Sequence, residues 1–162
     1  MKSGYPNSFH RGISSPGFID EGKYVNVQAF SFDKYDPNRK DGFRELSINW
    51  HDSDESIRIT LSQHKPYKSE PQFKVGFCSI NLSEVEMCLK VFISDGFFDY
   101  ERSPVVGCAD EDVDDNPFHG NLLVKESTPA HIYDSIKNTL AVLANNCGSI
   151  TFRVEVCNEI AE

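Results

Sequence analysis

Apolar residues alternate with polar ones in several short segments, and this spacing limits the possible fold more than any other feature of the chain. Leu46, Ile48 and Trp50 alternate with polar residues in the segment 44–50, and the segment 150–156 has the same pattern. A period of two is typical of a strand that buries one face. Such strands bury that face by pairing into a sheet, so both segments are predicted to be strands of an antiparallel sheet.

Other segments rich in β-branched and aromatic residues predict further strands. They are Tyr24–Phe32, Phe73–Ile80, Lys90–Ile93, Phe97–Tyr100 and Asn121–Lys125. The Ser-Asp-Gly sequence at 94–96 predicts a turn, through which Lys90–Ile93 and Phe97–Tyr100 would pair as a hairpin. Residues 1–23 are rich in Gly, Ser and Pro, and we expect them to be irregular.

Two helices are predicted in the first two thirds of the chain. In Asp52–Lys65, Asp52 and Glu55 have the spacing of a capping box. The apolar residues at 57, 59 and 61 also alternate as in a strand, but the start signal favours a helix. Ser83 and Glu86 have the same box spacing and predict a short helix over Ser83–Leu89.

The longest predicted helix follows Thr128, which is expected to cap it, with Pro129 in its first turn. Apolar residues at 132, 136, 140 and 143 line one face, and Gly148 supplies the stop after Asn146. The sequence therefore predicts a single α+β domain over residues 1–162, with a mostly antiparallel sheet and two or three helices packed on one face.

The net charge bears on the class of partner. The chain has 16 basic and 25 acidic residues, a formal charge of −9 and a pI near 5.0. This charge repels nucleic acid and anionic lipid, and it favours a basic protein or a cation. We therefore expect no nucleic-acid partner and no membrane partner.

The N-terminal residues lack the apolar core of a signal peptide, and no stretch reaches the length of a membrane span. The cysteines are odd in number and form no Cys-x-x-Cys motif; they are Cys78, Cys88, Cys108, Cys147 and Cys157. A disulfide framework or zinc knuckle is therefore not expected, and a reducing cytoplasm is the predicted location.

Five of the six residues from 110 to 115 are acidic, which is the sharpest local feature of the sequence. They are Asp110, Glu111, Asp112, Asp114 and Asp115. The alternate aspartates suggest an EF-hand, but Asp115 replaces the required Gly and Asn121 replaces the bidentate Glu. The run lies between an extended segment and the Asn-Pro-Phe-His-Gly turn at 116–120. It predicts an acidic loop that stays solvated, binds a cation weakly, or meets Lys and Arg of a partner.

No cofactor or metal site is indicated by the remaining motifs. Gly12 and Gly17 have the spacing of a phosphate loop, but Phe18 and Ile19 replace its Lys and Ser/Thr. The five histidines include no His-Glu-x-x-His pair, so no zinc site is encoded locally.

Three hypotheses about function remain, of which the weakest is a structural domain that binds a cation. The first is a non-enzymatic binding protein that engages a basic protein partner through the acidic run. An antitoxin or immunity protein covering the cationic active site of a toxin is its concrete form.

The alternative is an enzyme acting on a nucleotide-like or phosphorylated substrate. Its site would use His119 as a general base oriented by Asp114 or Asp115, with His10 and Arg11 in the same cleft. The segment His10-Arg11-Gly12 resembles the His/Arg segment that opens some ADP-ribosyltransferase-like domains. The resemblance covers three residues and assigns no family.

Overall fold

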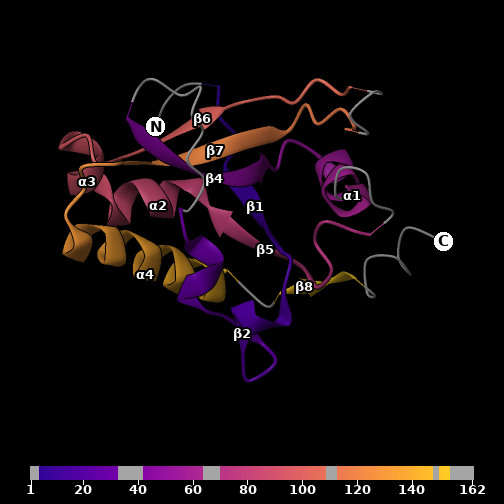
Figure 1. The fold of residues 1–162 in the computed structure, drawn as a ribbon, viewed down its shortest axis with the longest axis horizontal. Coiled ribbons are helices and arrows are strands. Elements are labelled where there is room, and N and C mark those ends of the chain that lie inside the picture. The colour runs from indigo at the N-terminus through magenta and orange to yellow at the C-terminus, as the bar shows by residue number, and fades with distance from the viewer. Residues whose placement is uncertain (1–3, 33–41, 64–69, 109–112, 148–149, 154–162) are drawn as a thin grey trace.

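The structure, a computed structural model, describes residues 4–32, 42–63, 70–108, 113–147 and 150–153 (Figure 1). The strands are β1 Ser8–Ile13, β2 Ile19–Asp20, β3 Tyr24–Val25, β4 Phe43–Trp50, β5 Gly76–Asn81, β6 Phe98–Arg102, β7 His119–Lys125 and β8 Thr151–Phe152. The helices are α1 Asp54–Ser62, α2 Leu82–Cys88, α3 Lys90–Ser94 and α4 Ala130–Asn146. The short 3-10 turns are η1 Pro16–Phe18 and η2 Val27–Phe30.

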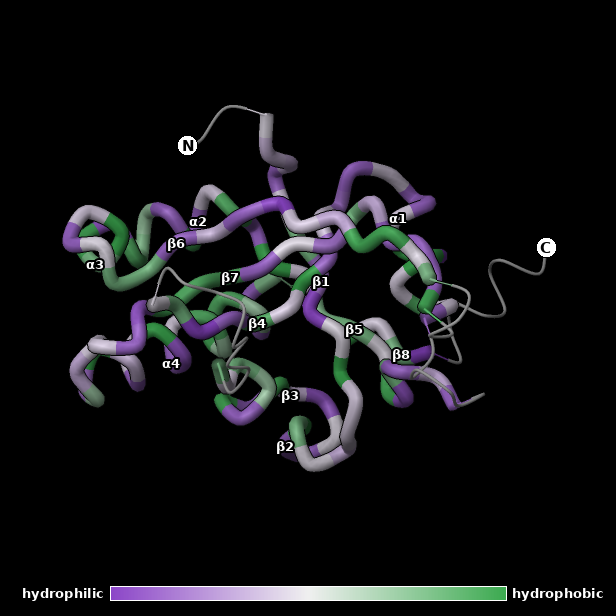
Figure 2. The backbone as a smooth tube through the Cα atoms, turned by 45° about the horizontal axis from the view of Figure 1, so that its top comes forward, coloured by the Kyte–Doolittle hydropathy of each residue, from purple (hydrophilic) through white to green (hydrophobic). Residues whose placement is uncertain are grey.

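Six strands form one antiparallel sheet in the order β6-β7-β4-β1-β5-β8. Strands β2 and β3 form a separate small hairpin, which lies below the sheet in both views (Figures 1 and 2). The predicted α+β fold with a mostly antiparallel sheet is confirmed. No helix in the described ranges is long and apolar enough to cross a membrane.

Strand β4 confirms the predicted strand at 44–50 and sits near the middle of the sheet. Leu46, Ile48 and Trp50 are buried in the core on one face, as the alternation requires. Helices α2 and α4 cover this face, and Figure 1 shows both lying along the same side of the sheet. In α4, Ile136 and Leu140 are fully buried, which confirms the predicted apolar face of that helix.

The expectation that residues 1–23 are irregular is wrong for Ser8–Ile13. These residues form β1, which pairs with β4 on one side and with β5 on the other. Phe9 and Ile13 are fully buried on the core face. The strand was missed because its stability comes from pairing with segments 40 and 70 residues away, not from its own composition.

The predicted strand Tyr24–Phe32 is also incorrect beyond Val25. The chain turns at Asn26, whose side chain accepts a hydrogen bond from the Gln28 N–H, and continues as η2. The turn buries Ala29 and Phe30 against α4. An Asn cap and burial by a helix therefore override the strand propensity of this segment.

Lys90–Ile93 was predicted as a strand and forms helix α3 instead. Ile93 N–H donates to the Leu89 carbonyl and Asp95 N–H donates to the Val91 carbonyl. As a result, β6 does not form the expected hairpin with this segment but pairs with β7. Phe92 and Ile93 pack against the core from this helix while Val91 is exposed, so tertiary packing overrides the strand propensity of the segment.

Three of the predicted helices form, but with different caps. Helix α1 begins after Ser53 because Asp52 pairs with Arg102, at 3.0 Å. Helix α2 is capped by Asn81, whose side chain accepts from the Ser83 N–H at 2.9 Å. Helix α4 begins after Pro129, and no side chain caps it.

Strand β7 confirms Asn121–Lys125 and extends it to His119, while β5 begins at Gly76 instead of Phe73. Of the predicted strand at 150–156, Thr151 and Phe152 form β8, and residues 154–156 lie outside the described ranges.

Gly120 provides a test of the packing in β7. A Cβ atom there would lie 2.1 Å from Trp50 Nε1 and 2.6 Å from the Glu101 carbonyl oxygen. We predict that Gly120→Ala lowers the free energy of unfolding by about 1–3 kcal/mol, the usual cost of overpacking, measured by urea denaturation. Gly17→Ala is the matched control, because its nearest neighbour would be Ser15 Oγ at 3.6 Å. Equal stability of the two variants would contradict this packing.

Candidate functional site

A row of polar residues crosses the sheet on the face opposite the main core. His10 in β1 lies directly opposite Ser79 in β5 and Asn49 in β4, and Asn49 lies opposite His119 in β7. Residues directly opposite in an antiparallel sheet point to the same face. These four side chains therefore share one face, and Asn49 alternates with the core residues Ile48 and Trp50.

His10 and His51 form a hydrogen-bonded pair at the centre of this row. His10 Nε2 lies 2.8 Å from His51 Nδ1, and His10 Nδ1 lies 2.9 Å from Ser79 Oγ. His10 is only 3% exposed, whereas His51, just after β4, is half-buried. The Ser56 hydroxyl of α1 lies 3.4 Å from His51 Nδ1 and donates to the Ser53 carbonyl. The pair thus links β1, β5 and the start of α1.

The geometry limits the charge of the pair. A single proton fits between His10 Nε2 and His51 Nδ1, so both rings cannot be protonated while the bond is kept. Burial, and secondarily the neighbouring His51, lower the pKa of His10 to about 3. His10 is therefore neutral at physiological pH.

A second polar network lies beside the histidine pair and consists of Asn49, Thr60 and Asn116. Asn49 Nδ2 donates to Thr60 Oγ1 of α1 at 2.9 Å, and Asn116 Nδ2 donates to Asn49 Oδ1 at 2.7 Å. Asn116 is fully buried, and its Oδ1 accepts from the Phe118 N–H. Because buried polar groups are costly when unpaired, this network fixes Asn116 to β4 and α1.

Asn116 lies in an extension of β6 and β7, residues 103–118, which we call the acidic arm. Bridges between Val105 and Asn116 and between Cys108 and Val113 continue the antiparallel pairing beyond the sheet. Figure 1 shows the segment that follows β6 and the segment that precedes β7 running side by side. Of the acidic run, the described residues Asp114 and Asp115 lie in this extension, between the two bridges.

The acidic residues of the arm are described only in part. Asp110, Glu111 and Asp112 lie outside the described residues, and Asp114 and Asp115 are exposed. Asp115 Oδ1 accepts from the Gly107 N–H at 2.7 Å. A Cβ atom at Gly107 would lie 2.7 Å from the Val113 carbonyl oxygen, so glycine permits the close approach of the two paired segments of the arm.

The residues of the enzyme hypothesis do not gather at one point. His10 and His119 share a face, but Asn49 separates them by two strand spacings, about 10 Å. His119 Nδ1 lies 2.6 Å from the Ser103 carbonyl oxygen, at the root of the arm. Arg11 points to the opposite face, where it donates to the carbonyls of Ala29 and Ser47.

Burial lowers the pKa of Arg11 to about 10, and the guanidinium donates to main-chain carbonyls. Burial also raises the pKa of the neighbouring Cys78 thiol to about 12, so this cysteine is protonated and unreactive. The contacts of Arg11 and Cys78 are those of structural residues.

Sequence reasoning missed His51, Asn49 and Asn116 as members of this site. One signal pointed to Asn49: together with Ser47 it forms the polar face of β4. Asn is also uncommon in strands. His51 and Asn116 gave none, because their partners are set by strand register across the sheet.

In the described part of the chain, no group of three or more His, Cys, Asp or Glu side chains is arranged to hold a metal ion. The sequence matches no model of a known protein family and no curated protein, and the fold matches no solved structure.

The lowered pKa of His10 predicts a pH dependence of stability. In the unfolded chain His10 takes up a proton below about pH 6.5, while in the folded chain it stays neutral down to about pH 3. Stability should therefore fall as pH drops below 6.5. We expect a loss of about 2 kcal/mol in the free energy of unfolding between pH 7 and pH 5.

The measurement is urea denaturation of the wild type and of His10→Gln at both pH values. The variant should lack most of this pH-dependent loss, whereas the control His131→Gln, at an exposed position of α4, should retain it. A pH dependence that is the same in all three proteins would show that His10 is not the group responsible.

Proposed function

We propose that this protein binds a basic protein partner through the acidic arm. The observation that carries the proposal is the position of Asp114 and Asp115, the described part of the acidic run, on an extension of β6 and β7 that buried Asn116 anchors. The exposed residues of the arm include Asp114, Asp115 and Val106, whose side chain is 84% exposed. An anchored arm with exposed carboxylates can meet a partner without a large ordering cost.

The electrostatics support the same choice. The formal charge of −9 attracts a cationic partner from a distance, and the acidic run concentrates negative charge at one projecting segment. Exposed carboxylates of this kind raise the association rate and select against acidic partners more than they add affinity. A flanking apolar residue such as Val106 would then supply the buried contact that electrostatic steering does not.

The concrete form of the proposal is an antitoxin or immunity protein that acts in the cytoplasm and covers the cationic active site of a toxin. The four described cysteines are free thiols, which is compatible with a reducing compartment. An acidic arm that enters a basic catalytic cleft would block substrate access there by occupying the same electrostatic site.

The first test neutralises the arm. The variant carries Asp110→Asn, Glu111→Gln, Asp112→Asn, Asp114→Asn and Asp115→Asn, and a nona-arginine peptide serves as the cationic probe. We expect its affinity, measured by titration calorimetry at low salt, to fall about tenfold or more, and its salt dependence to flatten.

The matched control removes five exposed carboxylates elsewhere: Glu21→Gln, Asp54→Asn, Glu70→Gln, Asp95→Asn and Asp134→Asn. It has the same net charge as the arm variant, so a general charge effect would weaken both equally. Equal weakening, or no weakening by the arm variant, contradicts the arm as the binding surface.

The toxin form has a separate genetic test. A neighbouring reading frame that encodes a basic protein should arrest growth when expressed alone, and co-expression of this chain should restore it. The arm-neutralised variant should fail to restore growth, as scored by colony counts, while the five-site control should succeed. Restoration by the arm-neutralised variant would contradict inhibition through the arm.

A further inference from the structure

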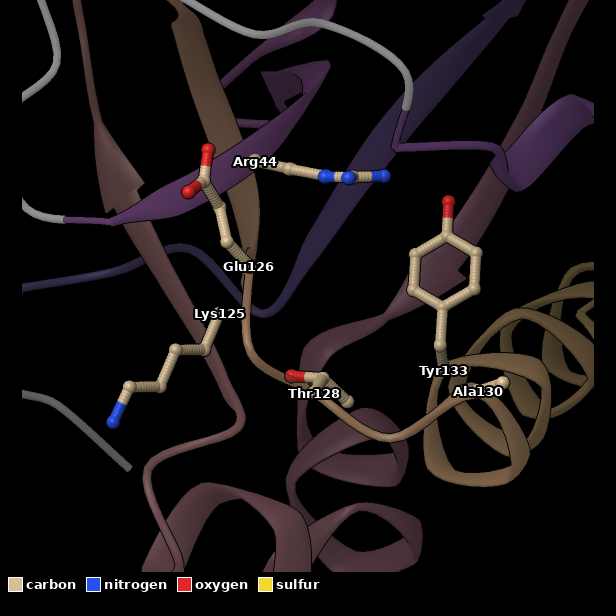
Figure 3. A pocket seen from close by; sticks show the side chains of 6 residues that line it. All are labelled: Arg44, Lys125, Glu126, Thr128, Ala130 and Tyr133. Atoms are coloured by element: carbon tan, nitrogen blue, oxygen red, sulfur yellow. The ribbon is translucent and has the colours of Figure 1, made fainter.

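A cavity of about 230 Å³ lies at the end of the sheet away from the acidic arm (Figure 3). It forms where the start of β4, the end of β7 and the first turn of α4 meet. Its lining residues are Arg44, Lys125, Glu126, Thr128, Ala130 and Tyr133. Two of the six are basic and one is acidic, so the lining carries a formal charge of +1 in a chain whose net charge is −9.

The lining is rich in hydrogen-bond donors. The Tyr133 hydroxyl oxygen accepts from the Phe32 N–H at 2.9 Å, which leaves its own proton to donate. Within the described ranges, no carboxylate forms an ion pair with Arg44 or Lys125. Donors that no protein carboxylate occupies favour an acceptor-rich ligand, and the Arg44 guanidinium would form charge-assisted hydrogen bonds with an anion.

The start of α4 also favours an anionic ligand. Ala130, the first residue of this 17-residue helix, lines the cavity, and no side chain caps the helix. The first N–H groups of a long helix carry a partial positive charge that stabilises a nearby anion. The helix end adds to the attraction for an anion, but the proposal rests on the side-chain donors.

The orientations in Figure 3 separate the contributions of the side chains. The Arg44 guanidinium extends towards the side of the cavity occupied by the Tyr133 hydroxyl. The Glu126 carboxylate lies beside the base of the Arg44 side chain, and the Lys125 ammonium points outward. Arg44 is therefore the cation placed to contact a ligand directly, while Lys125 contributes at longer range.

We propose that this cavity binds a phosphate group, either as inorganic phosphate or as the monoester of a small molecule. The Arg44 guanidinium is a planar fork of donors that matches two phosphate oxygens. The Tyr133 hydroxyl supplies a further donor, and the volume suits a compact oxyanion more than a drug-sized ligand. Glu126 opposes binding by charge repulsion. The proposal is independent of the acidic arm.

The test compares inorganic phosphate, glycerol phosphate and potassium chloride at equal ionic strength. Titration calorimetry and thermal unfolding should show one-site binding and a raised melting temperature with phosphate or its monoester, but not with chloride. Tighter binding of the monoester would assign the site to a phosphorylated small molecule. Tighter binding of inorganic phosphate would assign it to the free ion.

Four variants locate the site. Arg44→Gln should weaken phosphate binding about tenfold or more, and Tyr133→Phe, which removes the hydroxyl donor, by about threefold. Glu126→Gln should tighten binding by about threefold, because it removes the only carboxylate of the lining. Arg58→Gln, which removes an exposed arginine of α1 with the same change of charge, should leave binding within about twofold of the wild type.

The proposal is overturned if neither phosphate compound binds more tightly than chloride. It is also overturned if Arg58→Gln weakens binding as much as Arg44→Gln does, which would indicate general charge screening. Weaker binding in Glu126→Gln would place the anion elsewhere. Arg44 and Glu126 are both exposed, so their replacement tests the site without disturbing the core.

Discussion

The pairing of β4 with β1 and β7 determines both faces of the sheet at once. Leu46, Ile48 and Trp50 point into the core, and Asn49 points to the polar row. Because side chains alternate with a period of two, a slip of one residue would exchange these two sets. The register therefore fixes the core, the His10–His51 pair and the anchoring of Asn116 together.

The parts of the fold that could be predicted are those whose signal is local. The alternation in β4 and the amphipathic pattern of α4 extend over whole elements, so each segment carries its own evidence of structure. Strand β1 and helix α3 could not be predicted in this way. β1 is held by pairing with β4 and β5, and α3 consists of residues whose strand propensity is overridden by packing.

The residues of the site also divide into those with a local sequence signal and those without one. The acidic run was visible because adjacent residues carry it, and its expected position before the 116–120 turn places it in the arm. The His10–His51, Asn49–Asn116 and His10–Ser79 contacts join segments that are 41 to 69 residues apart in the chain. No local pattern encodes such contacts, since they arise only after the register of the sheet is set. The cavity at Arg44 has the same origin, because β4, β7 and α4 each supply part of its lining.

Strand β7 connects the acidic arm, proposed to bind a cationic partner, with the cavity, proposed to bind an anion. It leaves the acidic arm at His119 and reaches the cavity at Lys125, and its seven residues span roughly 20 Å. The Debye length at physiological ionic strength is about 8 Å, so the charges of the arm are largely screened at the cavity. The formal charge of −9 then governs the approach of a partner at long range, while the side chains within each region govern contact. A strongly acidic chain can therefore hold an anion at one end of β7 and a cationic protein at the other, with little interference between the two.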